Sequence, residues 1–365
     1  MKIGRFYQLC ISIILVLLIV YLLSKVQFLF QPFVLGFQIM ALPFLVSVFF
    51  YYTLRPAAHW LQKLKISKPF AILILYGIIA GLFTLFFLLV WPTLRGQLNG
   101  FINSLPQLAA DFQKQFSRLQ QHELLQGLNL NDPNLTTKLS EYIAQGIDAA
   151  STYVSGAVSF VTTIVIVIGT VPIMLYYMLK QDKDIYRKTL QITPGPYRRD
   201  LRGTLLEIDR ILSEFILGRF ILCLLLGGMI YLGFVIINLP YSLLLALFAA
   251  SMNLIPYIGQ VLGLIPALIV AFIDAPSMVI WVIVIHFAAQ QIEGNLLSPH
   301  IYGRKLNIHP VTTISLILVG GSIGGIIGIM TAIPFYLIAK VIAVKLYRFY
   351  RKRKKGESAD SNFSL

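Results

Sequence analysis

No Asp or Glu precedes Asp111, and almost every residue before Trp91 is apolar. A soluble domain with such a segment would expose more apolar surface than water tolerates. A bilayer-spanning segment needs this composition, because a charge at the membrane centre costs roughly 2.5–3.5 kcal/mol on insertion scales. The chain is therefore predicted to be an integral, all-α membrane protein.

The net charge of +15 is carried mainly by short basic segments between apolar runs, at 55–68, 180–210 and 340–355. This is the pattern of cytoplasmic loops that obey the positive-inside rule, and it differs from a basic groove that binds nucleic acid. Nucleic-acid binding is not expected. Cys10 and Cys223 lie inside apolar runs and are interpreted as buried structural thiols, so neither a disulfide nor a metal site is expected.

Apolar runs of about 20 residues predict membrane-spanning helices. The clear candidates are Leu9–Phe30, Phe33–Leu54, Phe70–Trp91, Gly156–Leu179, Ile211–Ile237 and Met278–Gln291. From Tyr197 a helix is predicted to run without a break into the fifth of these, with Arg219 two turns inside its apolar part.

All basic loops fall on the cytoplasmic side only under two conditions. Tyr241–Ile273 must enter and leave on the same outer face, as a re-entrant hairpin, and the stretch after Pro310 must make two short passes. This gives about eight spans plus the hairpin, with both termini cytoplasmic. The expected divisions are residues 1–92 (three spans), 93–155 (extracytoplasmic), 156–210 (fourth span and basic segment), 211–345 (core with broken helices) and 346–365 (basic cytoplasmic tail).

Segment 93–155 is predicted to form two amphipathic helices, separated at Asp132-Pro-Asn134. The first shows apolar residues at helical spacing from Leu98 to Leu119, and the second begins near Leu135. These helices could lie on the membrane surface, cap a cavity or pack against a neighbouring subunit. The pattern leaves these three possibilities open.

Polar groups and backbone breaks inside the apolar core are the candidate functional features. A helix is predicted to be interrupted at Asn253-Leu-Ile-Pro-Tyr-Ile-Gly-Gln260, which is followed by Pro266. The interruption is either a ligand-facing break of the kind found in transporters or a plain turn at the membrane surface. His286, Gln290 and Glu293 share one helix face, which indicates either a buried pathway or a polar packing seam. The predicted pathway residues are Asn253, Pro256, Gly259, Gln260, His286, Gln290, Glu293 and Asn295.

Two further features are interpreted as structural. Gly320, Gly324 and Gly328 recur at every fourth position, which is typical of close helix packing, with a gating hinge as the alternative. The basic tail Arg351-Lys-Arg-Lys-Lys355 is expected to hold anionic lipid rather than a specific protein partner.

Four segments resemble a signature of the autoinducer-2 exporter family of bacterial permeases: Asn253–Gly259 with Pro266, the run Glu293-Gly-Asn-Leu-Leu-Ser-Pro-His-Ile-Tyr-Gly303, Leu306-Asn-Ile-His-Pro310, and the stretch with Gly320-Gly321 and Gly324–Pro334. The resemblance implies a multi-pass, oligomeric protein of the bacterial inner membrane that moves a small solute or couples to an ion gradient. The positions that match the signature are Asn253, Pro256, Gly259, Glu293, Pro299, Gly303, His309 and Pro310.

The leading hypothesis is a permease that exports a small polar solute or exchanges ions, with His286 and Glu293 as its titratable groups. No G-x-x-x-x-G-K-[ST] loop occurs, which argues against ATP hydrolysis by the chain itself. The rival hypothesis is a membrane scaffold that binds envelope or division partners. An enzyme is not expected, because neither a nucleophile–base pair nor a metal-ligand cluster is visible, and no cofactor is predicted.

Overall fold

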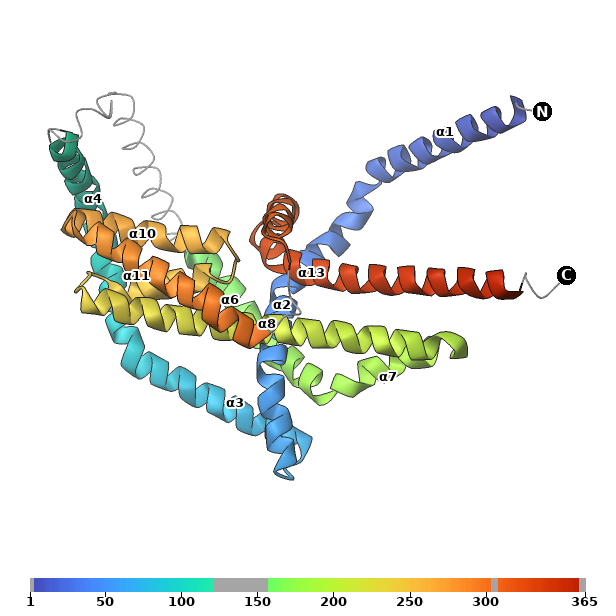
Figure 1. The fold of residues 1–365 in the computed structure, drawn as a ribbon, viewed down its shortest axis with the longest axis horizontal. Coiled ribbons are helices and arrows are strands. Elements are labelled where there is room, and N and C mark those ends of the chain that lie inside the picture. Colours follow the sequence, from blue (N-terminus) through green and yellow to red (C-terminus); the bar gives the residue numbers. More distant parts are fainter. Residues whose placement is uncertain (1–2, 121–156, 303–307, 361–365) are drawn as a thin grey trace.

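The computed structural model describes residues 3–120, 157–302 and 308–360, and all regular structure in these ranges is helical. The prediction of an all-α membrane protein agrees with this architecture. Figure 1 shows α1 and the carboxy-terminal part of α13 projecting from a central group of helices. The α-helices are α1 (Ile3–Lys25), α2 (Gln27–Lys63), α3 (Lys68–Leu85), α4 (Trp91–Gln120), α6 (Ala157–Lys180), α7 (Asp182–Ile192), α8 (Arg198–Ile236), α9 (Ser242–Met252), α10 (Ile258–Asp274), α11 (Met278–Ile292), α12 (Ser298–Tyr302) and α13 (Pro310–Asp360).

Several helical stretches among the described residues are long and apolar enough to cross a bilayer. They are Gln38–Lys63, Lys68–Ser104, Arg198–Ile236, Met278–Tyr302 and Ile327–Arg348. Shorter apolar helices accompany them at Val167–Lys180, Ser242–Met252, Ile258–Asp274 and Pro310–Gly325. The predicted continuous helix from Tyr197 into the fifth span is confirmed, since α8 begins at Arg198.

Two predicted boundaries were wrong. The break between the first two helices lies at Val26 rather than between Phe30 and Phe33, and Pro32 is inside α2. Hydropathy could not locate this break because the apolar run continues across it. The third span also does not end at Trp91: a π-helical turn, Phe86–Val90, joins α3 directly to α4.

The first predicted amphipathic helix is present as α4, which ends its described length at Gln120. It is a continuation of the spanning helix, so no loop separates the membrane segment from it. The predicted break at Asp132-Pro-Asn134 and the second amphipathic helix lie outside the described residues.

Helices α9 and α10 form an antiparallel hairpin across the segment predicted to be interrupted. The close approach of the two helices depends on two glycines: a Cβ on Gly259 would clash with the backbone oxygen of Met252, and a Cβ on Gly263 would lie 2.9 Å from the Cα of Ala249. At such distances only glycine lets the two backbones approach. Pro266, predicted to contribute to the break, lies within α10.

Helix α13 reverses direction at Gly324 and Gly325, whose backbone angles are not helical, with φ of +56° at Gly325. The predicted two passes after Pro310 thus correspond to two helical arms. Gly320 and Gly328 face each other where the arms cross, because a Cβ on Gly328 would lie 1.9 Å from the backbone oxygen of Gly320. A Cβ on Gly324 would meet nothing within 4 Å. The expected ridge of three packed glycines is therefore wrong: Gly320 and Gly328 contact each other, and Gly324 belongs to the turn between the arms.

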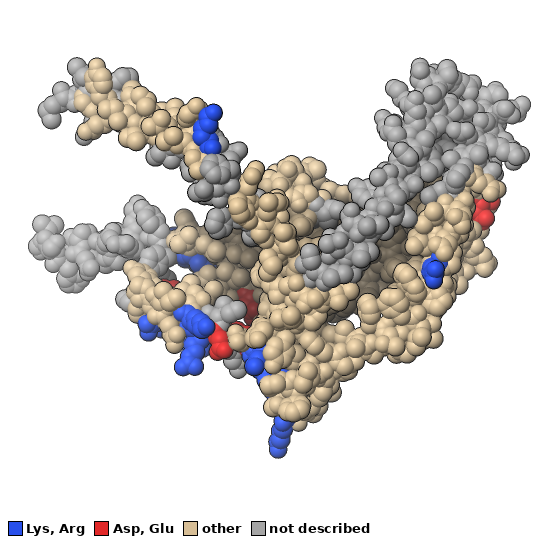
Figure 2. All heavy atoms as spheres, turned by 180° about the vertical axis from the view of Figure 1, so that it is seen from behind, with Lys and Arg blue, Asp and Glu red and all other residues tan. Residues whose placement is uncertain are grey.

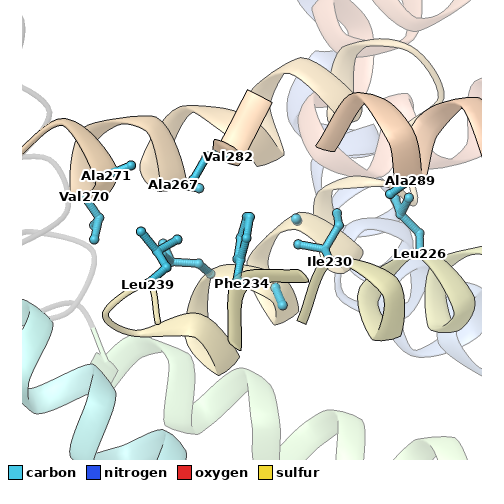
Figure 3. Close-up of a cluster of buried hydrophobic side chains, with 12 residues drawn as sticks. Leu226, Ile230, Phe234, Leu239, Ala267, Val270, Ala271, Val282 and Ala289 are labelled. Atoms are coloured by element: carbon cyan, nitrogen blue, oxygen red, sulfur yellow. The ribbon is translucent and has the colours of Figure 1, made fainter. Parts of the chain in front are cut away.

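Two clusters of buried apolar side chains organise the described helices. One joins α8, α9, α10 and α11: Phe234 of α8 is directed toward Ala267 and Val282, and Leu226 lies beside Ala289 (Figure 3). The other joins α2, α3, α6 and the earlier part of α8, and it includes Ile72, Leu175 and Ile216. Helix α8 is therefore the element common to both clusters.

The two ends of the helix group are held by different interactions. At the end that carries α7, Arg55 Nη1 lies 2.7 Å from Asp209 Oδ1, and Lys68 Nζ lies 2.6 Å from Asp182 Oδ1. Figure 2 shows Lys and Arg gathered toward this part of an otherwise largely uncharged face. At the end that carries α4, the contacts to the hairpin are neutral: the Leu244 amide donates to Gln97 Oε1 over 3.0 Å, and the Ser104 and Tyr241 hydroxyls are 3.2 Å apart.

Asp209→Asn is expected to lower the free energy of unfolding by about 1 kcal/mol, because Asp209 accepts hydrogen bonds from both Arg55 and Tyr52 at a partly buried site. The matched control is Glu214→Gln in the exposed Arg210–Glu214 pair, which should cost no more than about 0.5 kcal/mol. Unfolding of the purified variants in detergent measures both values. Equal losses would show that the Asp209 contacts contribute no more to stability than an exposed ion pair does.

Candidate functional site

Arg219 is the centre of the candidate site. It lies on α8 one turn after Ile216 of one apolar cluster and before Leu226 of the other, and its residue surface is only 7% exposed. A buried guanidinium is costly unless other groups replace its hydration. The position therefore requires partners from neighbouring elements.

Glu293 and Asn253 supply these partners. Arg219 Nη1 lies 3.5 Å from Glu293 Oε1, and Arg219 Nη2 donates to the backbone oxygen of Asn253. Asn253 Nδ2 in turn donates to both carboxylate oxygens of Glu293, over 3.1 and 3.2 Å. The three residues form a closed triangle of charge-assisted hydrogen bonds in which Asn253 is 0% and Glu293 2% exposed.

Asn253 reaches the triangle because α9 ends there. The chain turns through residues 253–257, and Tyr257 adopts φ 64° and ψ −60° before α10 begins. The turn leaves the Asn253 carbonyl at the carboxy end of α9, where a helix carries partial negative charge and a cation is favourable. Arg219 occupies this position.

Glu293 is placed by a second irregularity. A π-helical turn, Glu293–Leu297, joins α11 to α12. π-turns within helices are rare and frequently mark functional sites. Two interrupted helical segments therefore meet at one arginine from α8.

A cavity of about 450 Å³ adjoins the triangle. Arg219 and Glu293 form part of its wall, and further wall residues come from the α9–α10 turn, α12 and both arms of α13. These further residues include Pro256, Tyr257, Gln260, Pro299, Tyr302, Thr313 and Ile333. Arg219 Nε and the Tyr302 hydroxyl are buried without a hydrogen-bond partner among the described residues.

The structure gathers several of the predicted pathway residues at this cavity: Pro256, Gln260, Glu293 and, through the triangle, Asn253. His286 and Gln290 are not part of the cavity wall. His286 Nε2 lies 3.0 Å from the backbone oxygen of Gln260, and Gln290 Nε2 is buried without a partner among the described residues. Asn295 is exposed, and Gly259 serves the hairpin turn.

The remaining predicted motif residues have structural surroundings. His309 Nδ1 accepts a hydrogen bond from the Val311 amide over 3.3 Å at the start of α13, where Pro310 is the first helical residue. Pro299 is in α12 and borders the cavity. Gly303 lies outside the described residues.

Arg219 and Tyr302 are site residues that the sequence analysis did not assign. The available signal was a lone arginine within an apolar helix, since ionisable groups inside membrane segments are functional by default. Within the described ranges, no group of three or more His, Cys, Asp or Glu could hold a metal ion.

Several apolar helices of spanning length, together with a buried ion pair where helices break, define a polytopic α-helical membrane protein of the transporter class. Comparison with known proteins gives the family. The profile described as "AI-2E family transporter" matches residues 9–348, and the chain belongs to this family.

Curated relatives match along nearly the whole chain. The chain is 32% identical over 350 residues to "Putative transport protein YueF" of Bacillus subtilis, with 95% of each protein covered. It is 29% identical to "Putative transport protein YrrI" of the same organism, with 92% of this chain and 94% of the relative covered. "Putative permease PerM" of Escherichia coli K12 is 25% identical, with 82% and 85% covered.

Proposed function

We propose that this protein is a permease of the bacterial cytoplasmic membrane that exports a small polar solute or exchanges ions without hydrolysing ATP. The observation that carries the proposal is the buried Arg219–Asn253–Glu293 triangle beside a cavity at two helix interruptions. Interrupted helices whose ends meet at a central site are a recurring feature of secondary transporters. Family membership supports the same class of function.

In this proposal the solute enters the 450 Å³ cavity and interacts there with Arg219 and Glu293. Because each charge is already paired, a solute that engages either of them weakens their mutual contact, and the hairpin α9–α10 is then less firmly held to α8 and the π-turn. Coupling between solute and helix contacts of this kind is what allows a binding site to alternate its access.

The flux test uses proteoliposomes containing the purified protein. We expect protein-dependent movement of autoinducer-2, sodium or protons, and at least a tenfold lower rate in the double variant R219Q/E293Q, which removes both charges together. Ile342→Trp, at a partly exposed position outside the cavity wall, is the control that should retain the parent rate. Absence of protein-dependent flux for all three probes would reject autoinducer-2 export and sodium or proton exchange by this protein.

The proposed topology has both termini in the cytoplasm, residues 93–155 outside, and the α9–α10 hairpin entering and leaving on the outer face. In a variant without Cys10 and Cys223, we expect Leu125→Cys to react with a membrane-impermeant maleimide in intact cells. Leu64→Cys, in the basic connection between α2 and α3, should react only after permeabilisation. Labelling of Leu125→Cys only from the cytoplasm would invert the topology.

A second candidate is a scaffold for envelope or division partners. The length of α4, 30 residues continued directly from a spanning helix, favours it because such an extension offers an amphipathic surface to a partner. The flux assay separates the two candidates, since a scaffold moves no solute. Assembly into homo-oligomers and binding of anionic lipid by the basic tail remain predictions within either candidate.

A further inference from the structure

A second cavity of about 430 Å³ adjoins the first, and the two share Phe215 and Arg219 as wall residues. Apart from Arg219 the wall of this second cavity is mainly apolar and aromatic, with contributions from α2, α8 and the second arm of α13. Phe49, Leu212, Leu254, Met330 and Phe335 are representative wall residues. Arg219 thus stands between a polar space and an apolar space.

Arg219 has one donor without a partner among the described residues. Its Nη1 and Nη2 atoms are taken by Glu293 and Asn253, whereas its Nε–H has no partner among the described residues although the residue is more than nine-tenths buried. The buried Tyr302 hydroxyl lies beside the Arg219 guanidinium, its O–H has no acceptor in the same ranges, and Tyr302 belongs to the same cavity wall. Two donors without acceptors in one cavity call for a ligand oxygen, because buried polar groups are normally hydrogen-bonded.

A cation fits these groups poorly. The Asn253 carbonyl at the end of α9, where an interrupted helix would bind a cation, is already occupied by Arg219, and Glu293 is already paired with Arg219 and Asn253. An incoming cation would have to displace the arginine. An oxyanion can use Nε–H and the Tyr302 hydroxyl while the ion pair persists, and it lies beside the amino terminus of the 17-residue helix α10, whose dipole favours negative charge.

We propose that the joined cavities bind an amphiphilic oxyanion, with a carboxylate or phosphate head at Arg219 and Tyr302 and an apolar part among Phe49, Leu254 and Met330. Each cavity alone is within the roughly 300–1,000 Å³ typical of small-molecule sites. The inference rests on the proposed function, for which it specifies the substrate class. A soluble organic anion and an anionic phospholipid share this chemistry.

Binding of radiolabelled 4-phenylbutyrate to the full-length protein in phosphatidylcholine nanodiscs, corrected with empty nanodiscs, tests the proposal without requiring flux. We expect saturable binding at least tenfold tighter than that of acetate, which has the head but no apolar part. 4-Phenylbutanol, which has the apolar part without the charge, should compete at least tenfold less well.

Two variants assign the binding to the two cavities. Met330→Trp fills the apolar cavity from a residue 44% exposed and should weaken binding at least fivefold, while its control Ile342→Trp, 41% exposed and outside both cavity walls, should not. R219Q/E293Q removes the donor without leaving Glu293 unpaired and should weaken binding at least tenfold. If that variant does not fold, Met330→Trp together with the acetate comparison still decides the question.

Repeating the measurement in phosphatidylglycerol nanodiscs identifies the source of the ligand. Binding retained there supports a soluble organic anion, and binding present only in phosphatidylcholine supports the same site filled by anionic lipid. No saturable binding in either bilayer, equal affinity for acetate, or equal weakening by Ile342→Trp would overturn the proposal. Binding that depends on Met330 in a protein without flux would reject the transport function and leave the ligand class standing.

Discussion

Glu293→Gln is expected to lower the free energy of unfolding by about 3–5 kcal/mol, the range for removing one partner of a buried ion pair. The side chains of Arg219 and Glu293 are 9% and 3% exposed, so the remaining guanidinium would stay buried without its counter-charge. Arg219→Gln should cost a similar amount for the opposite reason. Removing both charges leaves neither uncompensated, so R219Q/E293Q should cost clearly less than the sum of the two single losses.

Unfolding of the parent, the two single variants and the double variant in detergent gives a complete double-mutant cycle. The exposed pair Arg210 and Glu214 is the matched control: the same substitutions there should each cost no more than about 0.5 kcal/mol. Strictly additive losses at Arg219 and Glu293 would mean that their 3.5 Å contact carries no coupling energy, and the triangle would then be held by Asn253 alone.

Gly328→Ala is expected to destabilise the protein by about 3 kcal/mol or more, at the upper end for overpacking, because a backbone atom has nowhere to move. The new Cβ would lie 1.9 Å from the backbone oxygen of Gly320, so the two arms of α13 would have to separate. Gly324→Ala is the control. Its Cβ meets nothing within 4 Å, and its φ of −129° is accessible to alanine, so the change should stay within about 1 kcal/mol.

Thermal unfolding of both variants in the same detergent measures the difference. The same pair tests the sequence interpretation, which treated Gly324 as part of a packed ridge and therefore predicts a large loss at that position. A Gly324 variant as unstable as the Gly328 variant would favour the ridge over the reversal of the chain described above.

The residues that interrupt or end helices predicted most of the architecture. Asn253, Pro256 and Gly259 mark a real helix interruption, because the residues that permit a tight turn are few and their chemistry is local. The π-turn at Glu293 could not be located in this way, because Gly294 and Pro299 mark the region as weak for a regular helix without saying what form the irregularity takes. Register shifts within a helix are set by packing rather than by composition.

Local sequence patterns could not predict that Arg219 pairs with Asn253 and Glu293. Arg219 is visible as an isolated charge in an apolar helix, but its partners are 34 and 74 residues away along the chain. Helical periodicity placed His286, Gln290 and Glu293 on one stripe, and His286 and Glu293 are both buried, yet of the three only Glu293 forms part of the cavity wall. A shared face gives a shared direction, but positions seven residues apart lie about 10 Å apart along the helix axis, so spacing alone does not say which of them meets a cavity.

The ion pairs at the α7 end and the neutral contacts at the α4 end give the molecule two ends that sense the surrounding solution differently. Added salt weakens partly exposed charge pairs such as Arg55–Asp209 only modestly, because their 2.7 Å separation is much shorter than the Debye length of about 10 Å at 0.1 M salt, and it leaves the neutral Leu244–Gln97 and Ser104–Tyr241 hydrogen bonds essentially unchanged. A rise in ionic strength therefore weakens the contacts at the α7 end slightly and those at the α4 end hardly at all. The small salt dependence of the stability of this helix group is set by the solution that the charged end faces.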